Sequence, residues 1–162
     1  MTVQGLANRL GALALGLSDR IRKTTDVASG HGGESSAALA AIGLEPGISN
    51  DGLRRVLALS HSGTVRLIDK LAADALVERR PARDGRAVAL HLTDLGVERR
   101  EFLLRKRSDT VDRALAMLDG SEQLALDALL GKLLTALPAN DEDVWSICRL
   151  CDFARCEGCP FH

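Results

Sequence analysis

The sequence predicts a mainly α-helical chain with one small β-hairpin, arranged as a winged helix-turn-helix. Three observations predict this fold class. Leucines recur at helical spacing near both ends of the chain, two helical segments meet at a tight turn around Ser60, and an arginine-rich hairpin follows them. An apolar residue at every third or fourth position indicates an amphipathic helix, whereas strict alternation indicates a strand.

The composition is that of a globular protein and argues against several function classes. Hydrophobic residues make up 46% of the 162 residues and charged residues 27%, an ordinary balance for one folded domain. Aromatic residues make up only 2%, which argues against a base-stacking platform for single-stranded nucleic acid. Because no apolar run approaches the roughly 20 residues of a membrane span, we expect a cytoplasmic protein without a membrane partner.

The first helices follow from apolar spacing and from glycine. A stripe of apolar residues predicts a first helix that ends near residues 25–28, formed by Leu6, Leu10, Leu13, Leu17 and Ile21. The glycine-rich residues 29–33 break this helix. A short helix over about residues 36–42 follows, and we expect Gly43 to stop it.

The helix-turn-helix is predicted over about residues 49–75. Ser49 is a suitable N-cap for a helix that runs to about Leu59, and Ser60 is a suitable N-cap for a second helix. The apolar pattern places Val65, Ile68 and Ala72 on the buried side of that second helix.

The wing is predicted over about residues 76–93. Two alternating runs, 77–81 and 87–92, flank Arg83-Asp84-Gly85-Arg86, and Asp-Gly in such a position is a strong hairpin signal. A long helix from Thr93 to about Leu118 and a last leucine-rich helix, capped by Ser121 and closed by Pro138, complete the expected elements.

Charge is distributed unevenly along a chain whose net charge is −1. Residues 49–107 hold 13 basic and 8 acidic residues, whereas residues 108–162 hold 4 basic and 10 acidic residues. A basic middle segment indicates a polyanionic partner. On charge alone, a solvated basic surface without a partner explains the pattern equally well.

The predicted second helix carries a polar face suited to the major groove of DNA. Ser62, Arg66 and Lys70 follow one another at intervals of four residues and share one face, and His61 and Thr64 flank it. The major groove admits an α-helix, and an arginine there can make a bidentate bond to guanine.

The hairpin tip supplies the second part of this predicted DNA-binding site. Arg83 or Arg86 can reach into a minor groove while the strands lie along the backbone. The alternative is that Arg66 and Lys70 are ordinary solvated charges that pair with the neighbouring Asp69 and Asp74. Agreement among the helix pair, the charge and the hairpin favours DNA binding.

These residues resemble the MarR (multiple antibiotic resistance regulator) family. Residues 59–71 and 76–79 look like its recognition helix and first wing strand, and Asp84-Gly85-Arg86 with residues 87–96 resembles its wing signature. The resemblance covers about residues 1–137 and is specific over about 49–96. Ala75 stands where the family usually has glycine.

The resemblance implies an intertwined homodimer that binds a pseudo-palindromic duplex operator and regulates transcription, most often as a repressor. Ser62, Thr64 and Arg66 match DNA-facing positions of the family, Arg86 its wing arginine, and Asp84 the acidic residue that braces the wing. Many members also respond to a small-molecule effector. The terminal leucine stripes independently favour a dimer, although they could instead pack on each other within one chain.

Residues 138–162, called the tail below, lie outside the resemblance and are expected to form an acidic linker followed by a cysteine cluster. The tail contains all four cysteines of the chain in the pattern C-x2-C-x4-C-x2-C: Cys148, Cys151, Cys156 and Cys159. Two such pairs can ligate one centre. The short separation between pairs suits an iron–sulphur cluster slightly better than Zn²⁺. A reactive-thiol switch and plain free cysteines are the alternatives.

The sequence thus predicts a dimeric DNA-binding regulator gated by a metal or redox centre. The alternative function is a redox or electron-transfer protein whose winged helix mediates protein contacts. We expect no enzyme, because no His, Asp and Glu constellation surrounds the cysteines and four thiolates leave a metal no open position.

Overall fold

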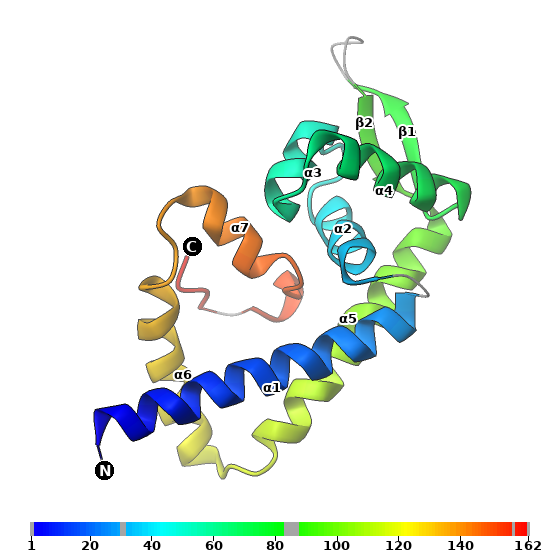
Figure 1. Cartoon of the computed structure of the whole chain (residues 1–162). Coiled ribbons are helices and arrows are strands. Elements are labelled where there is room, and N and C mark those ends of the chain that lie inside the picture. Colours follow the sequence, from blue (N-terminus) through cyan, green and yellow to red (C-terminus); the bar gives the residue numbers. More distant parts are fainter. Residues whose placement is uncertain (1, 30–31, 83–87, 157, 162) are drawn as a thin grey trace.

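A computed structural model describes residues 2–29, 32–82, 88–156 and 158–161 and has the predicted mainly helical architecture with one hairpin (Figure 1). The elements in chain order are α1 Val3–Ser29, α2 Gly33–Leu44, α3 Asn50–Leu57, α4 His61–Ala73, β1 Val77–Pro81, β2 Val88–Leu92, α5 Asp94–Leu115, α6 Gly120–Thr135 and α7 Asp141–Cys148, followed by a 3₁₀ turn at Phe153–Arg155. No helix in the described ranges is long and apolar enough to cross a membrane.

The molecule has two main parts, called the arm and the head below. The long helices α1 and α5 pack against each other and form the arm (Figure 1). Residues 33–92 form the head, in which α2 contacts α3, α4 and β2 and also packs on both helices of the arm. In the same view α7 lies between α6 and the head, and it contacts α3.

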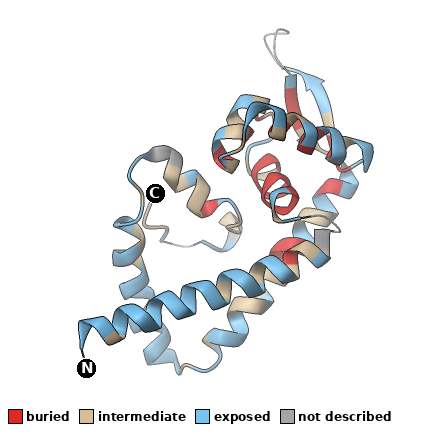
Figure 2. Cartoon of the chain, viewed as in Figure 1, coloured by how far each residue is buried: buried red, intermediate tan, exposed pale blue. Residues whose placement is uncertain are grey.

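The hydrophobic core lies in the head, as the concentration of buried residues in Figure 2 shows. Helix α2 is buried on nearly all sides because its side chains are small or apolar. The core combines apolar side chains from the head with one from α5: Ala38, Leu39, Ile42, Leu53, Ile68, Leu71, Leu90 and Leu103.

The expected limits of α2 were wrong, because Gly43 does not stop the helix. It lies inside α2, which runs to Leu44. A Cβ at position 43 would lie 2.3 Å from Cδ of Arg100, so glycine at this position lets α5 approach closely. Nε of Arg100 donates a hydrogen bond to the carbonyl of Ala40 at 3.5 Å, which joins the two helices.

Serine caps set the start of both helices of the helix-turn-helix, as predicted. The Ser49 hydroxyl accepts a hydrogen bond from the Gly52 amide at 3.0 Å, and the Ser60 hydroxyl accepts one from the Gly63 amide at 3.1 Å. The expected buried side of α4 was only partly right. Ile68 is buried with Thr64, Leu67 and Leu71, whereas Val65 and Ala72 are only partly buried.

Strand β1 begins and ends at the predicted residues, and β2 ends at the predicted Leu92; the predicted first residue of β2, Ala87, lies outside the described residues. The two strands pair antiparallel, with Val77 opposite Leu92 and Pro81 opposite Val88. The chain before α3 adds a short third edge, because the amide of Gly47 donates to the carbonyl of Leu90 at 2.8 Å. This edge fixes the hairpin against the start of the helix-turn-helix.

Two expectations for the C-terminal third are corrected. Asp119, rather than Ser121, caps α6: its carboxylate accepts from the Glu122 amide, and the Glu122 carboxylate accepts from the Asp119 amide, both at 2.9 Å. The acidic residues 141–143 are not a linker but the first turn of α7, capped by the side chain of Asn140.

Candidate functional site

The exposed face of α4 carries the polar side chains that the sequence singled out. His61, Ser62, Arg66 and Lys70 are all exposed. Leu67, Ile68 and Leu71 are buried on the opposite side and anchor α4 to the core. The head therefore presents this face to solvent as a rigid surface.

Thr64 does not belong to that surface, which corrects its assignment as a DNA-facing residue. Only 1% of Thr64 is exposed, and its hydroxyl donates a hydrogen bond to the carbonyl of Ser60 at 3.1 Å. Thr64 lies one helical turn before Ile68 and so falls on the buried side of α4, together with Leu67 and Leu71. A threonine hydroxyl in a helix can donate a hydrogen bond to a carbonyl of the preceding turn, so it does not need a partner in the solvent.

An ion pair between α4 and β1 orients the wing. Nη2 of Arg79 contacts Oδ1 of Asp69 at 2.6 Å. Asp69 is therefore engaged with the strand and does not neutralise Arg66 or Lys70. Within the described ranges, neither Arg66 nor Lys70 is ion-paired, so the face keeps its positive charge.

The wing tip lies outside the described residues. Arg83, Asp84 and Arg86 belong to residues 83–87, so their predicted contacts with DNA remain predictions. Strands β1 and β2 project from the head next to α4 (Figure 1). On β1, Arg80 pairs with Glu78.

The four cysteines of the tail are free thiols in different environments. Cys148, at the end of α7, is 8% exposed; Cys151 and Cys159 are half-buried, and Cys156 is exposed. The amide of Cys151 donates to the carbonyl of Cys148 at 2.8 Å, which closes a tight turn. Between Cys156 and Cys159, Gly158 has a positive φ of 66°.

Two of the cysteine thiols have a raised pKa. Burial raises the pKa of Cys148 to about 12, with the charge and hydrogen bonding of Cys151 as the next causes and smaller effects of Cys159 and Cys156. Burial and the hydrogen-bonded thiol of Cys159 raise the pKa of Cys156, while the guanidinium of Arg107 lowers it. No three His, Cys, Asp or Glu side chains in the described ranges are gathered closely enough to hold a metal ion.

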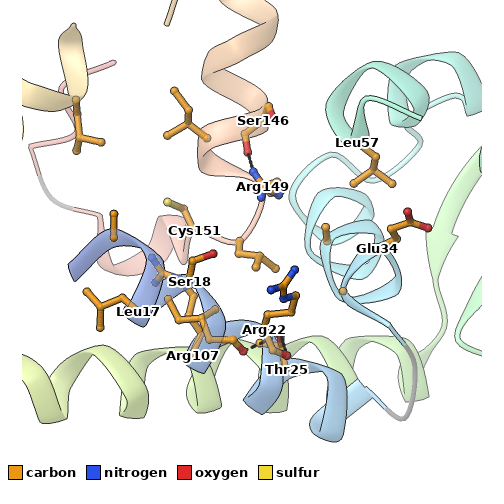
Figure 3. Close-up of a pocket in the computed structure, with 17 residues that line it drawn as sticks. Leu17, Ser18, Arg22, Thr25, Glu34, Leu57, Arg107, Ser146, Arg149 and Cys151 are labelled. Carbon is orange, nitrogen blue, oxygen red and sulfur yellow. Dashed lines mark hydrogen bonds between the residues drawn. The ribbon is translucent and has the colours of Figure 1, made fainter. Parts of the chain in front are cut away.

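A cavity of about 900 Å³ lies where the arm, the head and the tail meet (Figure 3). Three arginines line it, Arg22 from α1, Arg107 from α5 and Arg149 after α7. Its other lining residues include Ser18, Thr25, Glu34, Leu57, Leu150 and Cys151. This cavity could not be predicted from the sequence, because its wall is formed by residues far apart in the chain.

The fold recurs in solved structures. That of YusO from Bacillus subtilis matches with a TM-score of 0.71 and 20% identity, over 84% of this chain and 99% of that one. MepR, a transcription regulator of the Staphylococcus aureus multidrug efflux pump MepA, matches with a TM-score of 0.70 and 16% identity, over 85% and 100%. A MarR-family transcriptional regulator from Silicibacter pomeroyi matches with a TM-score of 0.64 and 26% identity, over 86% and 95%.

These matches define the chain as a winged helix-turn-helix protein, a fold that supports a DNA-binding transcription regulator. The family model described as MarR family matches residues 32–87, from α2 through the helix-turn-helix into the wing. The resemblance to the MarR family is thereby confirmed. A comparison with curated protein sequences finds no match.

Proposed function

We propose that the chain is a dimeric, sequence-specific DNA-binding transcription regulator that acts as a repressor. The observation that carries the proposal is the exposed cationic face of α4; the one acidic residue within α4, Asp69, is held by Arg79 of the wing strand. A protein that occupies duplex DNA in this way blocks access to it, which makes repression the simplest mode of control.

The dimensions of α4 fit the major groove. Its 13 residues span about 20 Å, and the groove is about 12 Å wide. Arg66 is then placed to read a guanine edge, and Lys70 to contact a phosphate. His61 and Ser62, in the first turn, are placed beside the backbone, where the helix N-terminus favours an anion.

Exposed leucines support a homodimer. Several apolar side chains of α1 are exposed in the single chain, and none of the residues of α6, all of them within the described ranges, is buried. Apolar surface of this extent marks an interface. The candidate interface residues on the two helices are Leu6, Leu10, Leu13, Leu124, Leu129, Leu130 and Leu133.

A small anionic effector is the ligand that best suits the cavity between arm, head and tail. Three guanidinium groups and one carboxylate, that of Glu34, line that cavity, and Arg22 is also paired with Asp19 at 2.7 Å. A ligand there touches both α1 and α2, so it can change how the head sits on the arm.

Selection of duplexes from a random library by the purified protein tests the proposed function. We expect enrichment of a pseudo-palindrome whose half-sites lie about 10 base pairs apart, since two copies of α4 must read one face of the duplex. The Arg66→Ala variant should lose the enrichment, and Arg105→Ala, an exposed arginine of α5 paired with Glu101, should keep it. Failure of the unmodified protein to enrich any sequence contradicts the proposal.

A further inference from the structure

The tail bridges the two parts of the molecule. Helix α7 packs against α3, the first helix of the helix-turn-helix. Immediately after α7, Leu150 and Cys151 line the cavity together with Leu17 of the arm and Leu57 of the head. The segment that contains all four cysteines therefore contacts the head and lines a cavity together with the arm.

We propose that Cys148, Cys151, Cys156 and Cys159 bind one thiolate-ligated metal centre, and that this centre holds the tail in its bridging position and so sets the position of the head on the arm. The metal site itself is independent of the proposed function. Only its consequence for operator binding rests on that function.

The backbone of the first cysteine pair forms a turn suited to ligation. Cys148 and Cys151 are joined by a tight turn with a 2.8 Å backbone hydrogen bond, and the second pair surrounds Gly158 in a left-handed conformation. Turns of this kind direct both thiols of a C-x2-C segment to one side. Ligation then requires the two turns to close on each other, because no three thiols lie at ligand distance in the described ranges.

The surroundings of the cysteines suit an anionic metal centre. Four thiolates bind soft metal centres and fill a tetrahedral site completely, which makes the site structural and not catalytic. Arg107 of α5 lies in the cavity wall and acts electrostatically on Cys156, so the arm supplies a cation that offsets the negative charge.

The burial of Cys148 argues against a simple thiol switch. A redox-sensing cysteine is accessible to oxidants, whereas Cys148 is buried at the end of α7. Burial of a ligand is the usual arrangement in a structural metal site. The centre acts by fixing the tail, and its loss frees α7 from α3 and changes the separation of the two recognition helices.

Metal analysis of the protein purified without oxygen from cells supplied with iron and zinc tests the site. We expect either one zinc per chain in a colourless protein, or iron with acid-labile sulphide in a brown one; these two results identify the centre. Cys156→Ser and Cys159→Ser should each lose the metal, and Arg155→Ala, a change of an exposed tail residue between the cysteines, should retain it. A chain that takes up neither zinc nor an iron–sulphur cluster on reconstitution overturns the proposal.

Hydrogen exchange measures the bridging role without DNA. In the metal-free protein we expect faster amide exchange over residues 50–57 of α3, with exchange over α2 unchanged. Equal exchange of α3 with and without metal overturns the coupling. A metal-loaded protein that selects no duplex refutes the proposed function alone, whereas a protein that takes up no metal on reconstitution and still selects a duplex refutes this inference alone.

Discussion

The hydroxyl of Thr93 donates a 2.6 Å hydrogen bond to the carbonyl of Ala75 across the base of the wing. The same oxygen accepts a 3.0 Å hydrogen bond from the amide of Gly96 and so caps α5. Ala75 follows the C-terminal end of α4, and Gly96 lies in the first turn of α5. One side chain therefore fixes the head to the arm at the point where the chain leaves the wing.

Replacement of Thr93 tests this connection. Thr93→Val removes both hydrogen bonds while keeping a similar shape, and it should lower the free energy of unfolding by about 1–2 kcal/mol. Thr93→Ser keeps the hydroxyl and should lose much less. Urea unfolding followed by circular dichroism measures both, and equal stability of the two variants would contradict the assigned role.

Glycine is required at position 96 because the backbone of Leu76, just before β1, lies directly against it. A Cβ at position 96 would lie 2.0 Å from the carbonyl oxygen of Leu76, a backbone atom that cannot move aside cheaply. Gly96→Ala should therefore destabilise the protein by about 1–3 kcal/mol despite the better helix propensity of alanine. In the control Gly120→Ala, the new methyl group meets nothing within 4 Å, so its midpoint of thermal unfolding should change little.

Ala75 occupies a conformation that favours glycine. Its φ is 55°, and the amide of Leu76 donates back to the carbonyl of Leu71 at 2.9 Å, the arrangement of a Schellman helix end. Ala75→Gly should raise the free energy of unfolding by about 0.5–1 kcal/mol, because relief of the left-handed strain exceeds the added chain entropy. The neighbouring change Ala73→Gly, inside α4, should lower it by up to about 1 kcal/mol. Equal effects of the two substitutions in denaturant titrations would contradict this explanation.

The proposed dimer interface is tested by charge insertion. Light scattering of the unmodified protein should give about 35 kDa, twice the 17.3 kDa of one chain. Leu13→Glu on α1 or Leu133→Glu on α6 should shift the protein towards the monomer, because each places an unpaired charge in apolar contact. Leu95→Glu, an equally exposed leucine beside the head, should leave the mass unchanged. A monomeric unmodified protein would refute the interface.

The elements with strong local signals were predictable from the sequence. Strand β1 begins and ends as expected and β2 ends as expected, since alternation of apolar and polar residues on either side of Asp-Gly has few alternative interpretations. The serine caps of α3 and α4 follow equally from local chemistry. Gly43 was misread because glycine as a helix stop and glycine at a close helix contact have the same sequence signal; only the position of Arg100 distinguishes them.

In the candidate site, the exposure of the charged side chains could be predicted from the sequence, whereas the burial of the others could not. The exposure of Arg66 and Lys70 follows from helical periodicity. The burial of Thr64 could not be predicted, because the polarity of its side chain favours an exposed position. Its hydroxyl is tolerated in the core because it donates a hydrogen bond to the preceding turn. The cavity could not be inferred, since Arg22, Arg107 and Arg149 are brought together only by tertiary packing.

The salt dependence of operator binding tests the central claim most directly. Fluorescence anisotropy with the selected duplex should give a logarithm of the affinity that falls linearly and steeply with the logarithm of the salt concentration. Arg66→Ala should weaken binding by about 1–3 kcal/mol and relax the preference at one base pair, and Lys70→Ala should reduce the slope by about one. Arg105→Ala should match the unmodified protein. An affinity that does not change with salt concentration would contradict the assignment of α4 as the DNA-reading helix. An Arg66→Ala variant with unchanged affinity and specificity would contradict it as well.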